Sequence, residues 1–224
     1  DIAGLVAGAS KGEGLGNQFL ANIRETEAIA QVVRCFADDN VVHVAGKVDP
    51  IADIDIINTE LVLADLDSVE KALAKNQKQA KTGAKAILAH KAVLQQVHAH
   101  LDQGLPVRTL DLDDDAEEIL KPLHLLTHKR LLYIANVDDD GFSDNAYLTA
   151  VEQYAAAENA LVVPVCASIE AELSMMDDDD RLEFLDDLGL SEPGLDRVVR
   201  AGHELLGLQT YFTAGETEVR AWTV

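Results

Sequence analysis

The sequence predicts a three-layer α/β domain with a mostly parallel sheet, interrupted by a helical hairpin insertion. Short apolar runs typical of strands alternate with longer segments of helical periodicity, which favours a parallel sheet covered by helices. A central segment free of Gly and Pro repeats apolar residues every three or four positions. The chain has 224 residues, 48% of them hydrophobic, which suits one large domain or a domain with an insertion.

The N-terminal part combines a glycine-rich connection with apolar runs. The stretch G-A-S-K-G-E-G-L-G is too dense in glycine for regular structure; its glycines are Gly8, Gly12, Gly14 and Gly16. Apolar positions at Phe19, Ile23 and Ile29 then predict one helix, with Leu20 and Ala30 close by. The run at 31–36 predicts a buried strand, and V-V-H-V at 41–44 predicts a second short extended segment.

The middle of the chain has the periodicity of an antiparallel helical hairpin. Residues 54–73 repeat apolar side chains at helical spacing, Thr82 and Gly83 break the pattern, and residues 87–101 resume it. A shorter acidic helix is expected at residues 113–123. An apolar stripe of this kind is more typical of packing between helices than of partner binding.

Strands alternate with helices again towards the C-terminus. Strands are expected at residues 131–137 and 161–166. Helices are expected at 144–158, 169–176, 178–188 and 192–206, and the alternating end of the chain suits edge strands. We therefore expect residues 1–52 and 129–224 to form the α/β domain, with residues 53–128 as its insertion.

The composition excludes several classes of function. A formal net charge of −22 argues against charge-driven binding to nucleic acid or anionic lipid. The sequence contains no apolar run of membrane-spanning length and no signal-like segment. Cys35 and Cys166 are far apart and each ends an apolar run, which suits buried free thiols; a redox-sensing scaffold would require reactive thiols.

Three short motifs are candidates for nucleotide chemistry. Residues 1–4, D-I-A-G, match D-x-x-G, in which the acid holds magnesium and the glycine amide meets the terminal phosphate of a nucleotide. N-V-D-D at 136–139 follows a strand, where an amide and a carboxylate can bind a purine edge, although an ordinary turn has the same composition. P-V-C-A-S-I-E at 164–170 is a strand running into a helix, which alone decides nothing.

The order of these pieces resembles the Obg-like ATPases of the YchF type. The resemblance runs through D-I-A-G-L-V-A-G-A-S-K-G-E-G-L-G-N-Q-F-L, V-V-R-C-F, V-V-H-V-A-G-K-V-D-P, Y-I-A-N-V-D-D-D-G-F and E-P-G-L-D-R-V-V-R-A-G-H-E-L-L-G-L-Q-T-Y-F-T-A-G-E-T-E-V-R-A-W-T-V. It covers nearly the whole chain and is weakest between about residues 75 and 129. It implies a P-loop-NTPase-like fold in a parent protein with an upstream phosphate-binding P-loop and a C-terminal TGS domain.

The resemblance also implies roles for individual residues in magnesium-dependent ATP hydrolysis. Asp1 would support the magnesium ion, through water, and Gly4 would sense the terminal phosphate. Leu5 has no hydrogen-bonding group to orient the attacking water, so the resemblance points to His43 for that role; the alternative is a structural histidine.

For the base, the resemblance points to Asn136, Val137 and Asp139, helped by Ala167 and Ser168. The family usually has glutamate where this chain has Asp139, so ATP is expected with some use of GTP. The implied parent is a cytoplasmic regulator that contacts ribosomes and is linked to translation or stress responses. This chain alone is expected to be inactive without the P-loop; the alternative function is a non-catalytic interaction module acting through the helical hairpin.

Overall fold

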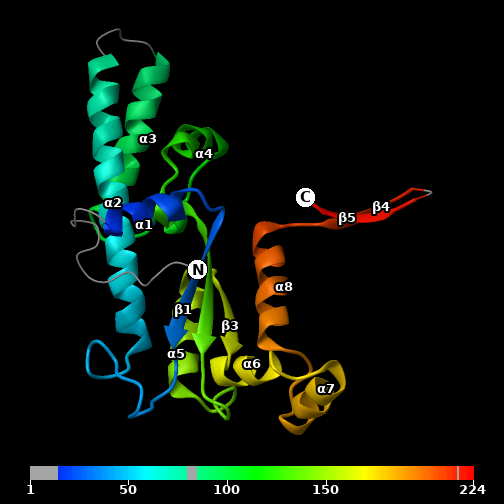
Figure 1. Ribbon diagram of the computed structural model, residues 1–224. Helices are drawn as coiled ribbons and strands as arrows, with labels where there is room; N and C mark the ends of the chain where they lie inside the picture. The colour runs from blue at the N-terminus through cyan, green and yellow to red at the C-terminus, as the bar shows by residue number, and fades with distance from the viewer. Residues whose placement is uncertain (1–14, 80–84, 216) are drawn as a thin grey trace. The chain divides into compact units, whose positions relative to one another are not determined.

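The computed structural model describes residues 15–79, 85–215 and 217–224, which form two compact units (Figure 1). The helical unit contains the described part of residues 1–27 together with 52–129, and the α/β unit contains residues 28–51 and 130–224. The predicted D-x-x-G segment, with Asp1, Gly4 and Leu5, lies outside the described residues.

A parallel sheet of three strands is the centre of the α/β unit. Its strands are β1 (Ala28–Arg34), β2 (Arg130–Asn136) and β3 (Leu161–Val165), in the order β1-β2-β3. All pairings are parallel, with Ala28 opposite Arg130 and Leu132 opposite Leu161. The parallel sheet expected from the sequence is therefore present.

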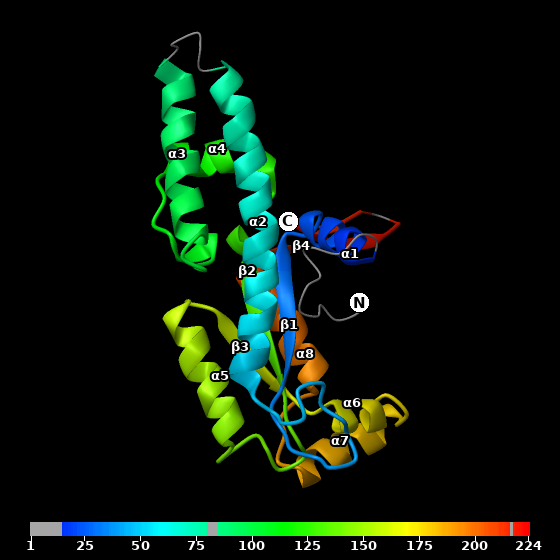
Figure 2. The same ribbon diagram turned by 90° about the vertical axis from the view of Figure 1, so that its left-hand side faces the viewer.

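Helices cover both faces of this sheet. On one face, Leu132, Val163 and Val165 pack against Val198, Ala201 and Leu205 of α8 (Gly194–Leu206). On the other face, the ring of Tyr133 meets that of Tyr154 from α5 (Ala146–Ala157) edge-on, with centroids 6.3 Å apart. Figure 2 shows α5 and α8 on opposite sides of the strands. Alternation along β2 thus produces the expected three layers.

The remaining elements of the α/β unit follow β3. They are α6 (Ala167–Leu173), α7 (Asp178–Asp187) and an antiparallel hairpin of β4 (Thr210–Ala214) with β5 (Val219–Thr223). The Glu170 carboxylate of α6 accepts the Gly194 N–H at 2.6 Å and the Leu195 N–H at 3.1 Å. This side chain from one helix thereby satisfies amides at the start of another, where they have no partner within their own helix.

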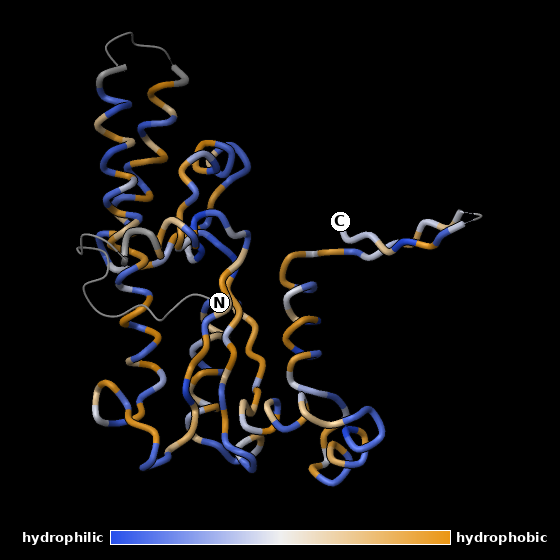
Figure 3. Tube along the Cα trace, in the orientation of Figure 1, coloured by the Kyte–Doolittle hydropathy of each residue, from blue (hydrophilic) through white to orange (hydrophobic). Residues whose placement is uncertain are grey.

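The helical unit consists of α1 (Leu15–Arg24), α2 (Pro50–Gln79), α3 (Lys85–Leu101) and α4 (Asp114–Leu120). A short 3₁₀ turn at Val107–Thr109 connects α3 to α4, and two more at Lys121–Leu123 and Leu126–His128 follow α4. The long helices α2 and α3 lie side by side as an antiparallel pair, around a core with Val62, Val69, Leu94, Val97 and Leu101 (Figures 1 and 2). Figure 3 shows hydrophobic residues running along β1 to β3, whereas α2 and α3 alternate in polarity.

Two local predictions were wrong. Ile29 and Ala30 lie in β1 and not in a helix, because their backbones pair with Leu131 and Leu132. The segment 41–44 is not a strand: it lies in the loop between β1 and α2, where Val42 and Val44 are 92% and 98% exposed. Valine-rich sequence favours strands only where a sheet offers a pairing edge and a face to pack on.

Candidate functional site

Those candidate site residues that the structure describes lie at one edge of the parallel sheet. Because parallel strands end at the same edge, the loops after β1, β2 and β3 meet there, the usual place for ligands in such folds. The loop after β1 carries His43. β2 ends at Asn136 and the loop after it carries Asp139, and Ala167 and Ser168 begin the helix that follows β3.

Hydrogen bonds join the β2 and β3 loops. The Ala167 N–H donates to Asn136 Oδ1 at 3.1 Å. Asp139 Oδ1 accepts from Ser168 Oγ at 2.8 Å and from Cys166 Sγ at 3.1 Å. These two side-chain hydrogen bonds lower the pKa of Asp139 below its ordinary value, so its exposed carboxylate stays charged to lower pH than a free aspartate.

The same bonds define what this pair of loops can recognise. The side-chain carbonyl oxygen of Asn136 already accepts a hydrogen bond from the first N–H of α6, whereas its NH₂ group is a donor. A charged carboxylate such as Asp139 acts only as an acceptor, and its two oxygens accept several hydrogen bonds. A donor beside an acceptor matches the edge of a purine, with ring nitrogens that accept and an amino or imino group that donates.

Val137 lies beneath the turn that follows β2. Its side chain is 2% exposed, and its N–H donates to the Val165 carbonyl at 2.9 Å. Gly141 closes the turn with a hydrogen bond to Asp138 O at 3.0 Å, and a Cβ at Gly141 would lie 3.1 Å from the Val137 Cβ. Val137 therefore packs on the buried side of the turn and presents almost no surface on which a base could pack.

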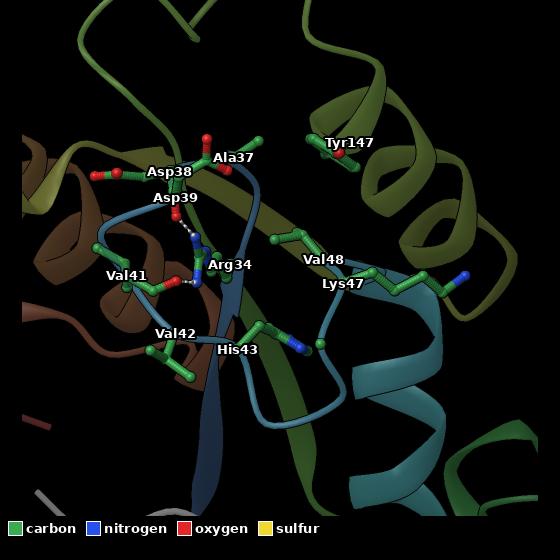
Figure 4. Close-up of a pocket in the computed structure, with 11 residues that line it drawn as sticks. Arg34, Ala37, Asp38, Asp39, Val41, Val42, His43, Lys47, Val48 and Tyr147 are labelled. Carbon is green, nitrogen blue, oxygen red and sulfur yellow. Dashed lines mark hydrogen bonds between the residues drawn. The ribbon is translucent and has the colours of Figure 1, made fainter.

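His43 lies in the loop between β1 and α2, beside a cavity of about 370 Å³ (Figure 4). The lining residues include Arg34, Asp38, Lys47 and Tyr147 from α5. The Ala45 N–H donates to His43 Nδ1 at 3.2 Å. Since Nδ1 accepts, a neutral ring in this position carries its proton on Nε2.

Two further residues that shape this edge were not predicted from the sequence. Asn145 caps α5, because its Oδ1 accepts from the amides of Tyr147 and Leu148 at 2.9 and 3.1 Å, and its Nδ2 donates to Cys35 O at 2.9 Å. An asparagine directly before a helical pattern is a capping signal that was available in the sequence. Arg34, the last residue of β1, hydrogen-bonds backbone carbonyls of the His43 loop, and no sequence signal marks such a role.

Both cysteines are buried, as expected. Cys35 is 0% exposed, and burial raises the pKa of its thiol to about 12. Burial is also the main reason that the pKa of Cys166 is raised. A thiol that stays protonated and inaccessible is a poor nucleophile, so nothing here supports a redox-sensing scaffold.

Neither a membrane span nor a metal cluster occurs among the residues that the structure describes. No helix there combines the length and the apolar content needed to cross a membrane. Nor do three or more His, Cys, Asp or Glu side chains converge there in a way that could hold a metal ion. Asp1, the residue expected to support magnesium, lies outside the described residues.

Known proteins resemble this chain over its whole length. The ribosome-binding ATPase YchF of Haemophilus influenzae is 58% identical over 224 residues, and that of Bacillus subtilis is 48% identical over 226 residues; both matches cover 100% of this chain and 62% of the relative. The solved structure of the Schizosaccharomyces pombe YchF GTPase superposes with a TM-score of 0.84 at 33% identity, over 95% of this chain and 59% of that one. No family model matches the sequence.

Proposed function

Because this chain belongs to the YchF family, we propose that the full-length protein is a magnesium-dependent ATPase that binds ribosomes, with weaker use of GTP. The chain spans 62% of the length of the curated relatives it matches. In this proposal residues 1–52 and 129–224 are two parts of one nucleotide-binding domain, residues 53–128 are its helical insertion, and the P-loop lies upstream. We place the protein in the cytoplasm by analogy with the family.

The observation that carries the proposal is the hydrogen-bonded pair of loops at the ends of β2 and β3. Asn136 is held by the Ala167 amide, and Asp139 is held by Ser168 and Cys166. Groups already fixed by neighbours lose little further freedom when a base binds, so their hydrogen bonds contribute more fully to affinity. In the proposed complex Asn136 donates to the base and Asp139 accepts from it, while Val137 supports them from below.

We assign the positioning of water to His43. Leu5 has no polar group for this task, and the imidazole is half-buried on a loop at the same sheet edge as the base residues. In the arrangement seen here Nδ1 accepts from the Ala45 N–H, so the neutral ring would orient the water by donating from Nε2, as a positioning group and not as a base. A non-catalytic role for the helical hairpin remains the alternative, but no observation on that hairpin favours it.

Asp1 and Gly4 complete the proposal at the phosphate end. Asp1 would hold magnesium through water, and the Gly4 amide would meet the terminal phosphate. When bound, magnesium neutralises charge that builds up on the phosphate oxygens. A chain without the P-loop lacks the backbone cradle for the phosphates, so we propose that the 224 residues alone hydrolyse no nucleotide.

Contact with the ribosome would not depend on attraction to RNA in this part of the protein. A net charge of −22 is repelled by phosphate, so an acidic chain gains nothing from the release of counterions. A basic ribosomal protein, or a basic part of the full-length chain, is the better-matched contact. Ribosome pelleting over a range of salt concentrations, with this chain and the full-length protein side by side, tests the assignment.

The test of the nucleotide assignment uses the full-length protein and a variant that restores the family's acid, Asp139→Glu. Fluorescent ATP and GTP analogues are titrated in magnesium, and turnover is followed on the same samples. We expect both proteins to bind ATP more tightly than GTP, with a larger margin in Asp139→Glu. A clear preference for GTP in the unmodified protein would overturn the choice of ATP, and binding of neither would overturn the proposed function.

A further inference from the structure

We propose that Arg34 is the positioning residue of the His43 loop, holding the backbone that presents the imidazole. The inference rests on the proposed function, because it assigns Arg34 to the same reaction as His43. Arg34 is the last residue of β1 and lies opposite Asn136 in the sheet. Its backbone is therefore fixed to the strand that carries the base residues, while its side chain reaches into the loop.

The guanidinium contacts three separate points of the loop. Its Nε donates to Phe36 O at 3.1 Å, its Nη1 to Val41 O at 2.9 Å and its Nη2 to Asp38 O at 3.2 Å. The same group lies 4.5 Å from the centroid of the Phe36 ring, within reach of a cation–π interaction. Figure 4 shows Arg34 enclosed by the backbone that leads to His43.

These hydrogen bonds from Arg34 matter because the loop that carries His43 has no regular secondary structure of its own. Residues 37–49 contain neither helix nor strand. Local turns contribute hydrogen bonds from Val41 N to Asp38 O at 3.2 Å and from Gly46 N to His43 O at 3.0 Å. Turn bonds of this kind fix a few residues at a time, whereas the Arg34 side chain ties positions 36, 38 and 41 to the end of a strand.

The chemistry of arginine is specific to this role. A guanidinium is planar and offers five N–H donors in fixed directions, so it can serve three carbonyls at once and still lie against a ring. A lysine ammonium keeps the charge but not the planar fork. Arg34→Lys should therefore reproduce most of the defect of Arg34→Ala, a result that a requirement for charge alone does not predict.

The test is a double-mutant cycle on the full-length protein, with Arg34→Ala, Arg34→Lys, His43→Ala and the double variant Arg34→Ala/His43→Ala. Arg220→Ala, which removes an exposed arginine from β5, is the matched control. ATP turnover at saturating nucleotide gives kcat, nucleotide titration gives the affinity, and amide hydrogen exchange of residues 36–46 reports loop order independently of turnover. Thermal unfolding checks that each variant is folded.

We expect both Arg34 variants to lower kcat by roughly 10- to 100-fold, the scale of a catalytic group moved by about 1 Å, with ATP affinity changed less than about twofold. Exchange in the loop should become faster. In the His43→Ala background, Arg34→Ala should lower kcat no further, because two residues that act through one step are not additive.

Different failures overturn different claims. An equal loss of kcat from Arg34→Ala with and without His43 would show that Arg34 acts elsewhere and would overturn the inference. Unchanged loop exchange in both Arg34 variants would do the same, whatever the rate. If His43→Ala hydrolyses ATP as fast as the unmodified protein, the proposed role of His43 fails, and the functional part of this inference fails with it.

Discussion

At the scale of single residues, the carboxylate of Asp139 illustrates how neighbouring donors fix a side chain and shift its pKa. Two side-chain donors, Cys166 Sγ and Ser168 Oγ, fix one of its oxygens and lower its pKa. A carboxyl whose pKa is depressed in the folded state contributes stability above its unfolded value of about 3.9 and loses it as the pH falls through the folded value.

The pH dependence of the Asp139→Asn variant tests this directly. We expect the unmodified chain to be the more stable of the two at neutral pH, because only the carboxylate is charged and favoured by both donors. The difference should shrink as the pH falls below about 4, since a protonated Asp139 is as uncharged as asparagine. Urea unfolding between pH 3 and pH 7 measures it; a difference that grows towards low pH would contradict the assignment.

The thiol of Cys35 is the opposite case, a reactive group made inert by its surroundings. It is 0% exposed, and burial raises its pKa to about 12. We predict that iodoacetamide at pH 7.5 leaves Cys35 unlabelled in the folded chain and labels it quickly in guanidinium chloride, as read by mass spectrometry of the peptides. Stoichiometric labelling within minutes in the native state would restore the redox interpretation.

At the scale of elements, one buried carboxylate on α2 joins that helix to the turn at Leu126–His128 and to the end of α1. Asp65 of α2 is 0% exposed and accepts the amides of Leu126 and Thr127 at 2.8 and 2.7 Å and the Thr127 hydroxyl at 2.7 Å. Arg24 at the end of α1 lies 3.8 Å from the same group. Burial raises the pKa of Asp65, and these donors and the arginine charge act against that shift.

The substitution Asp65→Asn should therefore destabilise the helical unit. An amide group can replace one acceptor but turns an NH₂ donor towards another donor, and we expect a loss of about 2–4 kcal/mol in the free energy of unfolding. The control is Asp67→Asn on the same helix, where an exposed ion pair with Lys71 should contribute less than about 1 kcal/mol. Similar losses from the two variants in chemical denaturation would contradict the buried network.

The sequence was most informative about where helices begin, because side chains next to the helix start decide it. Its acidic clusters begin helices: Asp113 caps α4 by accepting the Ala116 amide at 2.8 Å, and Asp177 caps α7 by accepting the Asp180 amide at 3.1 Å. It failed where tertiary pairing decides, as at Ile29, which helical spacing assigned to a helix but which pairs with Leu131 in the sheet.

At the scale of the whole molecule, the meeting of the loops after β2 and β3 could be predicted, because neighbouring parallel strands end at the same edge of a sheet. Asn136 and Ala167 are 31 residues apart and still meet at 3.1 Å, as expected for neighbouring parallel strands. The role of Arg34 could not be predicted, because it depends on the path of an irregular loop back over the strand end. For the same reason the burial of Val137 under its turn was visible only in three dimensions.

The central claim, that the full-length protein hydrolyses ATP with His43 positioning the water, depends on one comparison. Single-turnover ATP hydrolysis is measured with the full-length protein and with its His43→Ala variant, at nucleotide concentrations that saturate both. We predict a rate roughly 100-fold lower in the variant, the scale of a misplaced reactant, with ATP affinity unchanged within about twofold. Equal rates in the two proteins would contradict it and return His43 to a structural role.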